Sequence, residues 1–591
     1  MARYSGWWRA LEVAALLAWG AGCKSLEVEN PNAPERERAF SDPATIVASA
    51  GGTMKTWVNT RFSALDARKL TADPDANSGP PMALSAMADS YTASWNNWQM
   101  RYYSSYGVEC PDRCAWVNST STPLGQQVEP FWYGAYSMIS SANDALFAMR
   151  LAADPPGLGT DKARTETIAQ MAQAMGHAWV ALNYDKGFIV TEDLDTAEEL
   201  ASLNLTPRQA IRDEAIKMFD KAHQLAKAAS FQTVSTWFGV INGPVYTNLQ
   251  LGKVIRTMQA ELLAHYPRNA EENAQVTWSQ VANYASQGIS SNTDGAPFDF
   301  TAYQDDVYYS TTAAFSSMYH YWGNDITTVR VDTRVARLLS TTQADPWPGG
   351  AGNPQPADAA GNPIGGVYGV DLRLGDGCFG DEDDYFDMGG CASTDQSGTD
   401  FLWSPVAIFR PERGQFHQSN IAHIRFRCLA EGHFDCPTGQ APIPIYLEAF
   451  NDLLWAEALI RTNTNLGLAA QLINKSRVGR GGLPPMTGAH SQQQLFAALL
   501  YEQDVELIAT AQTQFYNRRR FTRSTGQPEG PYVWNTLWRD TPRQMPIPAK
   551  DIQLLRAEIR PDIYTFGGRN NPSGAVAPRD PTRRFGKPRP N

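Results

Sequence analysis

Two stretches of the chain alternate aromatic rings with amide and carboxylate side chains. The first runs from Tyr91 to Tyr103, and the second runs from Phe298 to Tyr309 and continues to Trp322. Flat rings supply stacking area and the polar groups between them orient hydroxyl groups, which suits the binding of sugars. The alternative is that these rings only pack a loop onto the body of the protein, because tryptophan is highly buried on average. The residues expected to contact a ligand are Trp95, Asn96, Trp98, Tyr308, Tyr309 and Trp322.

Two pairs of carboxylates are spaced by about one helical turn. Glu448 and Asp452 form one pair and Glu502 and Glu506 the other, so each pair can share a helix face. Glycoside hydrolysis needs two such groups, one as acid and one as nucleophile or base. The same spacing is common on solvated helices and in ion pairs, here with Arg477, Arg480 and Arg518 as candidate partners. Since GxSxG, P-loop and HExxH motifs are also absent, we expect no catalytic residue and no enzyme.

An acidic cluster lies between Asp376 and Asp387. Carboxylates at this density can bind Ca²⁺, which takes six to eight oxygen ligands. The candidate ligands are Asp381, Asp383 and Asp387, although their spacing is not that of an EF-hand loop. The alternative is a solvated acidic loop. We therefore expect no required cofactor, with structural Ca²⁺ as the one candidate metal.

The N-terminus has the layout of a secretory signal. Arg3 and Arg9 precede an apolar run, and small residues lead up to Cys23. The apolar run is too short for a comfortable membrane span. A cysteine at the cleavage point indicates a bacterial lipoprotein signal, in which the Cys23 thiol is acylated. The alternative is an ordinary signal peptide cleaved nearby, which would leave Cys23 free.

The remaining six cysteines form an even set. An exported chain meets an oxidising compartment, where such thiols pair. Of the connectivities that six cysteines allow, we favour the one that joins sequence neighbours. No CxxC motif occurs, so a metal site on these cysteines is disfavoured. The expected disulfides are Cys110–Cys114, Cys378–Cys391 and Cys428–Cys436.

Composition limits the class of protein. The chain has 591 residues, a net charge of −11 and 43% hydrophobic residues, enough for a sizeable core. The negative charge argues against general nucleic-acid binding, which needs a basic surface. No segment after the signal approaches the roughly 18 consecutive apolar residues of a membrane-spanning helix. We therefore expect any attachment to a membrane to be through the lipid.

Apolar residues recur at helical spacing on both sides of a region rich in Gly, Pro, Asp and aromatic residues. Thr206 and Ser491 are each followed three residues later by Gln, which predicts helix starts there. The predicted segments are a signal peptide (1–22), a lipidated tether (23–40), an N-terminal helical part (41–297), a loop-rich, disulfide-stapled insertion (298–444), a C-terminal helical part (445–566) and a basic Pro-rich tail (567–591).

The helical segments come in pairs joined by short breaks. Such pairs bury their apolar faces on one another in an α-solenoid. The predicted fold class is therefore mainly α, a tetratricopeptide-like helix-pair solenoid with a long irregular insertion.

Several blocks resemble the pattern of the SusD/RagB family of nutrient-binding outer-membrane lipoproteins. One is the helix from Ile445 to Leu459, with Glu448 early and Glu457 in an Ala-Glu-Ala step. Departures include Gln503 in place of Arg and Thr510-Ala511 in place of Glu-Gly, so the chain resembles a divergent member. The other blocks are Trp132 to Asn143, Leu472 to Leu483, Glu502 to Arg519 and Pro546 to Ile552.

The resemblance implies a SusD-like helical fold and a surface-exposed lipoprotein, anchored in the outer membrane and facing outside. It also implies a partner, a TonB-dependent transporter of the SusC type, to which bound oligosaccharides or peptides are delivered. Two other functions stay open. One is an exported polysaccharide-active enzyme on a helical scaffold, and the other is a solenoid scaffold for protein interactions.

Overall fold

The computed structural model describes the helical body and parts of the region between its two halves. The described residues are 42–62, 80–94, 100–104, 113–120, 128–151, 157–194, 199, 202–292, 296–305, 315–323, 329–340, 342–343, 371–375, 399–403, 418–429, 439–526 and 535–554.

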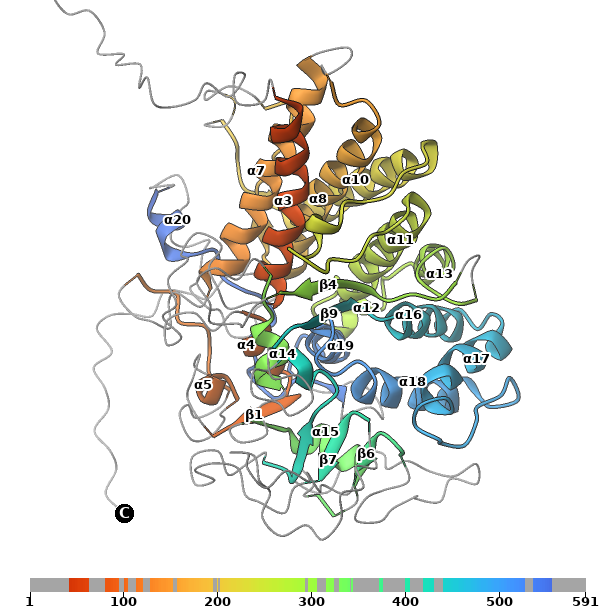
Figure 1. Ribbon diagram of the computed structural model, residues 1–591. Coiled ribbons are helices and arrows are strands. Elements are labelled where there is room, and N and C mark those ends of the chain that lie inside the picture. Colours follow the sequence, from red (N-terminus) through yellow and green to blue (C-terminus); the bar gives the residue numbers. More distant parts are fainter. Residues whose placement is uncertain are drawn as a thin grey trace, which may run out of the picture.

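Long helices stack on one another in a curved array (Figure 1). Each packs against the next along the chain, from the α3–α7 contact to the α16–α17 contact, and α13 joins the N-terminal helices to α16. This packing confirms a mainly α, tetratricopeptide-like fold. The helices are α3 (Pro43–Phe62), α7 (Glu129–Leu151), α8 (Asp161–Asn183), α10 (Arg208–Ala228), α11 (Asn248–His265), α13 (Trp278–Ala285), α16 (Glu448–Arg461), α17 (Leu466–Arg477), α18 (Gln492–Val505) and α19 (Thr513–Phe521).

Short elements fill the space around this array. The short helices are α4 (Pro80–Met87), α5 (Met100–Ser104), α12 (Ala270–Asn273), α14 (Met318–Gly323), α15 (Thr333–Leu339), α20 (Ala549–Leu554), and the 3-10 turns η2 (Ser235–Trp237) and η4 (Arg427–Leu429). The strands are β1 (Tyr91–Ala93), β2 (Lys186–Gly187), β3 (Thr206–Pro207), β4 (Phe300–Gln304), β5 (Val329–Val331), β6 (Leu374–Gly375), β7 (Phe401–Trp403), β8 (Ile421–His423) and β9 (Ala441–Tyr446).

The strands pair across long separations in the chain. β1 pairs with β5, β2 with β3 and β4 with β9, all antiparallel, whereas β7 lies between a parallel β6 and an antiparallel β8. In the β4–β9 pair, Phe300 is opposite Tyr446. The chain therefore leaves the helical body along β4 and returns to it along β9, side by side (Figure 1).

Local sequence explains where several helices begin. Ser491 and Gln494 form the predicted capping box at the start of α18, and Thr247 with Gln250 forms one at α11 that the sequence analysis missed. The helix predicted to start at Thr206 is present as α10, but the Thr206 hydroxyl does not cap it. Thr206 belongs to β3, its hydroxyl donates to the Asn204 carbonyl at 3.3 Å, and α10 begins only at Arg208. The β2–β3 pairing takes up the backbone that the motif assigned to a helix.

One apolar core runs through both halves of the chain. Trp57 of α3 lies 6.2 Å from Phe300 and 6.3 Å from Tyr446, measured between ring centroids. The guanidinium of Arg61 lies over the Tyr446 ring and contacts Glu261 of α11 at 2.6 Å. The first long helix, the β4–β9 pair and α11 are thus joined at one point.

Buried arginine also links helix ends. Arg519 of α19 donates to the carbonyl oxygens of Leu182 at 2.9 Å and His265 at 2.7 Å. These carbonyls lie in the last turns of α8 and α11, where the helices leave such groups without an internal partner. A cation at a helix C-terminus is also favoured by the helix dipole. Arg519 therefore caps the C-termini of α8 and α11 and holds both helices against α19.

Candidate functional site

Most of the predicted ligand residues lie outside the described part of the chain. This holds for Trp95, Asn96, Trp98, Tyr308 and Tyr309. Trp322 is part of α14, but its side chain is not among those described. Their contact with a ligand stays a prediction.

The structure does bring together elements that flank both aromatic stretches. β1, just before Trp95, pairs with β5, and β5 contacts α14, the helix of Trp322. A Cβ added at Gly323 of α14 would stand 3.0 Å from the hydroxyl of Tyr91 in β1, which shows how closely the two elements pack. The described ends of the two stretches, β1 and α14, therefore lie close together.

Several rings of these stretches belong to the core. Tyr91, Tyr103, Phe300 and Tyr319 are fully buried. The hydroxyl of Tyr319 accepts a hydrogen bond from Ser85 at 2.8 Å. For these four rings the packing interpretation is correct, and they are not available to stack on a ligand.

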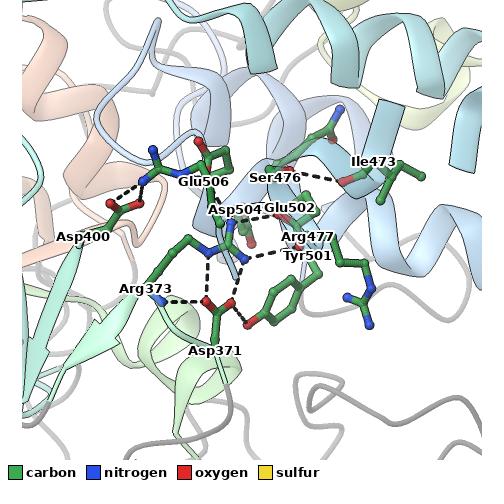
Figure 2. Close-up of polar contacts among 12 residues, drawn as sticks. Asp371, Arg373, Asp400, Ile473, Ser476, Arg477, Tyr501, Glu502, Asp504 and Glu506 are labelled. Carbon is green, nitrogen blue, oxygen red and sulfur yellow. Dashed lines mark hydrogen bonds and ion pairs between the residues drawn. The ribbon is translucent and has the colours of Figure 1, made fainter. Parts of the chain in front are cut away.

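Glu502 and Glu506, one of the two carboxylate pairs, are buried on a single guanidinium (Figure 2). Arg373 contacts Glu502 at 2.8 Å and Glu506 at 3.0 Å through Nη1, and Asp371 at 2.7 Å through Nη2. The hydroxyl of Tyr501 donates to Asp371 at 2.8 Å. Burial opposes the charge on Arg373, but the carboxylates outweigh it and raise its pKa above the usual range.

A second layer of charges surrounds this cluster. Arg425 contacts Glu506 at 3.0 Å, and Arg480 contacts both Glu506, at 3.1 Å, and Asp400. Burial favours the neutral form of Asp400, but Arg425 and Arg480 outweigh it and lower its pKa. The cluster therefore fastens residues 371–375 and 399–403 to α18. Glu502 and Glu506 face arginine rather than solvent.

The other pair, Glu448 and Asp452, is bridged by Lys475 of α17. The Nζ atom lies 2.9 Å from Glu448 and 2.6 Å from Asp452. Burial raises the pKa of Asp452 to about 6, although Lys475 acts in the opposite direction. The ammonium group thus occupies the space between the two carboxylates, where a glycosidase would place the bond to be broken.

Of the arginines named from the sequence, Arg480 is correctly a partner of Glu506. The central cation of the Glu502–Glu506 cluster was missed. Arg477 donates instead to the Pro484 carbonyl at 2.8 Å, and Arg518 contacts Asp504 at 2.9 Å. The central cation, Arg373, comes from a region without helical periodicity. Only its spacing from Asp371, two residues earlier, was a local signal.

Most residues of the predicted disulfides and of the predicted metal site lie outside the described ranges. Cys114 and Cys428 are the cysteines in the described ranges, and both are disulfide-bonded. The remaining residues of these predictions lie outside those ranges: Cys23, Cys110, Cys378, Cys391, Cys436, Asp381, Asp383 and Asp387. Which cysteines pair, and whether Ca²⁺ binds, stay predictions. Elsewhere in the described ranges no group of three or more His, Cys, Asp or Glu side chains could hold a metal.

No helix in the described part of the chain is both long and apolar enough to cross a bilayer. A scan against models of known protein families finds no match, and a comparison with curated proteins finds no sequence relative.

Solved structures are similar in fold. A SusD superfamily protein from Parabacteroides distasonis matches with a TM-score of 0.52 at 11% identity, covering 87% of this chain and 96% of that one. A SusD-like carbohydrate-binding protein from Bacteroides fragilis matches with a TM-score of 0.52 at 11% identity, covering 87% and 98%. A SusD superfamily protein from Bacteroides vulgatus has a TM-score of 0.50 at 11% identity, covering 87% and 97%. The chain therefore has the SusD-like fold, at low sequence identity to these structures.

Proposed function

We propose that this chain is a non-enzymatic, lipid-anchored protein of the outer membrane that binds oligosaccharides or peptides outside the cell. It delivers them to a TonB-dependent transporter of the SusC type. The observation that carries the proposal is the fold shared, over 87% of this chain, with a structure described as a SusD-like carbohydrate-binding protein. Trp95, Trp98, Tyr308, Tyr309 and Trp322 are the rings proposed to stack on the ligand.

Calorimetric titration of the mature chain against panels of oligosaccharides and peptides tests the binding role. Trp95→Ala and Trp98→Ala should each weaken binding about tenfold, because each removes a stacked ring. The matched control is Tyr133→Ala, which removes a partly exposed ring of α7 outside both stretches. It should leave binding unchanged. The proposal fails if no ligand of either panel binds, or if all three variants bind alike.

The proposal of a non-enzymatic protein is supported by the placement of the carboxylates. Glu502 and Glu506 are buried on Arg373, and Lys475 stands between Glu448 and Asp452. Glycans incubated with the protein should keep their chain length. If they shorten, and Glu448→Gln or Glu502→Gln stops the shortening, the protein is an enzyme.

Anchoring and delivery need separate tests. Mass spectrometry of the native N-terminus should find an acylated Cys23, and Cys23→Ser should raise the share of the protein found in the soluble fraction. Detergent extracts should contain a complex with a SusC-type barrel. If neither ligand panel binds but a soluble protein partner is captured, the chain is an interaction scaffold instead.

A further inference from the structure

The segment from the end of η2 to the first turn of α11 exposes an unusual group of aliphatic side chains. Val240, Ile241, Val245 and Leu249 are 52%, 72%, 47% and 65% exposed. They account for four of the six large apolar residues that are exposed in the described part of the chain. No charged residue lies between Val240 and Gly252. We call residues 238–249 the apolar loop.

The apolar loop is held firmly in this exposed conformation. The Asp305 carboxylate accepts hydrogen bonds from the backbone N–H groups of Val240, of Ile241 at 3.2 Å and of Asn242 at 3.4 Å. The turn is so tight that a Cβ added at Gly243 would stand 2.0 Å from the Ser235 carbonyl oxygen. Phe238, at the base of the loop, is buried in the core. The fold therefore presents these side chains to solvent on a rigid support.

A cavity of about 590 Å³ lies beside the loop and opens onto the start of α3. Val240 of the loop and Pro43 of α3 both line it, and its floor includes the ring of Trp237. Gly51 of α3 packs directly against this ring, since a Cβ added there would stand 2.0 Å from it. Its other lining residues are mainly apolar, with Lys55 and Asp161 as the charged residues among them.

The position of this surface relative to the proposed lipid anchor is its second distinctive feature. Asp42, where the described chain begins, lies 19 residues after Cys23, and the next residue, Pro43, already lines the cavity. Nineteen residues span at most about 65 Å even when fully extended. If Cys23 is acylated, the tether thus enters the body at the cavity and keeps this face within reach of the bilayer.

We propose that the apolar loop and the adjoining cavity form a membrane-contact surface, which lies on the bilayer that holds the Cys23 acyl chains. The inference rests on the lipid anchor of the proposed function. Exposed aliphatic residues in a segment that has no charged side chain of its own suit the boundary between head groups and acyl chains. Protein interfaces instead draw their binding energy from Trp, Tyr and Arg, and none of these side chains is exposed in the loop.

The test uses the full mature chain with Cys23→Ser, so that the acyl group cannot contribute. Co-sedimentation with vesicles of phosphatidylethanolamine and phosphatidylglycerol measures its partition coefficient. The parent should bind. Ile241→Asp and Leu249→Asp should each lower the partition coefficient about tenfold, because each places a charge where an aliphatic side chain is buried in lipid.

Leu372→Asp is the matched control, since Leu372 is 66% exposed but lies far from the loop in sequence, beside Gly482. It should leave vesicle binding unchanged, and all variants should melt at the parent temperature. The inference is overturned if the parent does not bind vesicles, or if the three variants have equal partition coefficients. It is also overturned if Ile241→Asp lowers vesicle binding only by dissociating a dimer of this chain. Glycan binding, measured on the same variants, should not change, so a failure of the ligand-binding proposal is recognised separately.

Discussion

Arg520 and Glu457 form a two-point ion pair in the centre of the C-terminal half. Both guanidinium nitrogens, Nη1 and Nη2, lie 2.6 Å from the carboxylate oxygens, and both side chains are fully buried. Burial favours the neutral form of Glu457, but Arg520 and then Arg461 outweigh it and lower its pKa to about 2. The pair joins α19 to α16, two helices that are not consecutive in the chain.

We predict that Glu457→Gln lowers the free energy of unfolding by about 3 to 5 kcal/mol, because it leaves the Arg520 charge buried without a counter-ion. Urea denaturation at pH 7 measures the change. Glu448→Gln in the first turn of the same helix is the control and should cost at most about 1 kcal/mol, since its ion pair with Lys475 is partly exposed. Equal losses in the two variants would contradict the role given to the Arg520 pair.

A second prediction concerns the cluster around Arg373. Arg373→Met removes the shared cation of Asp371, Glu502 and Glu506, and should cost about 3 to 5 kcal/mol at pH 7. Part of this loss should be recovered on acidification, when the stranded carboxyl groups can bind protons. Arg150→Met removes an exposed cation near Asp193 and should change stability by less than about 1 kcal/mol. A variant as stable as the parent would show that the cluster does not hold this region in place.

A third prediction is pH dependence through His177. Its Nδ1 donates to the Gln173 carbonyl at 2.7 Å and its Nε2 accepts from the Val190 N–H at 3.1 Å, so the ring is neutral. Burial lowers its pKa to about 4, below the ordinary value of about 6.5. A depressed pKa gives stability that is present above the ordinary value and is lost as pH falls towards the folded value.

Between pH 6.5 and pH 4 the parent should therefore lose roughly 3 kcal/mol through this ring alone. His177→Gln should be less stable at pH 7, and its urea midpoint should fall less steeply with acidification. His490→Gln is the control, because the His490 ring bonds only to nearby Thr487. Parallel pH profiles for the parent and His177→Gln would refute the assignment.

The fourth prediction uses two adjacent glycines of α3. A Cβ at Gly51 would stand 2.0 Å from the Trp237 ring, whereas a Cβ at Gly52 meets nothing within 4 Å. Gly51→Ala should therefore destabilise the protein by about 1 to 3 kcal/mol through overpacking. Gly52→Ala should stabilise it by about 0.5 to 1 kcal/mol, since alanine is the better helix residue. Thermal melting of both variants distinguishes them, and effects of the same sign would contradict the packing described.

Local signals explain the parts of the fold that were predicted correctly. The apolar residues Ile168, Met171, Met175, Trp179 and Leu182 recur at helical spacing and are buried in α8, as is every residue from Thr167 to Asn183. Ser491 caps α18, as its spacing from Gln494 indicates. Each of these features depends on residues a few positions apart.

The wrong capping role given to Thr206 was also inferred from residues a few positions apart. A hydroxyl and a glutamine three residues apart favour a capping box, but antiparallel pairing with Lys186–Gly187 took the backbone instead. No residue near Thr206 indicates that this segment pairs as a strand. Secondary-structure preference is a weak prior when a tertiary contact competes for the same backbone groups.

The sequence by itself determined the periodic helices, their pairing into a solenoid and the residue types that suit a bound sugar, because all of these follow from side chains close together in the chain. Only the tertiary structure decided that Glu502 and Glu506 are buried on Arg373, about 130 residues earlier, and that the apolar loop is exposed beside the start of α3. Burial and ion pairing are set by which distant segments meet, and charge or hydrophobicity read along one segment does not reveal its neighbour.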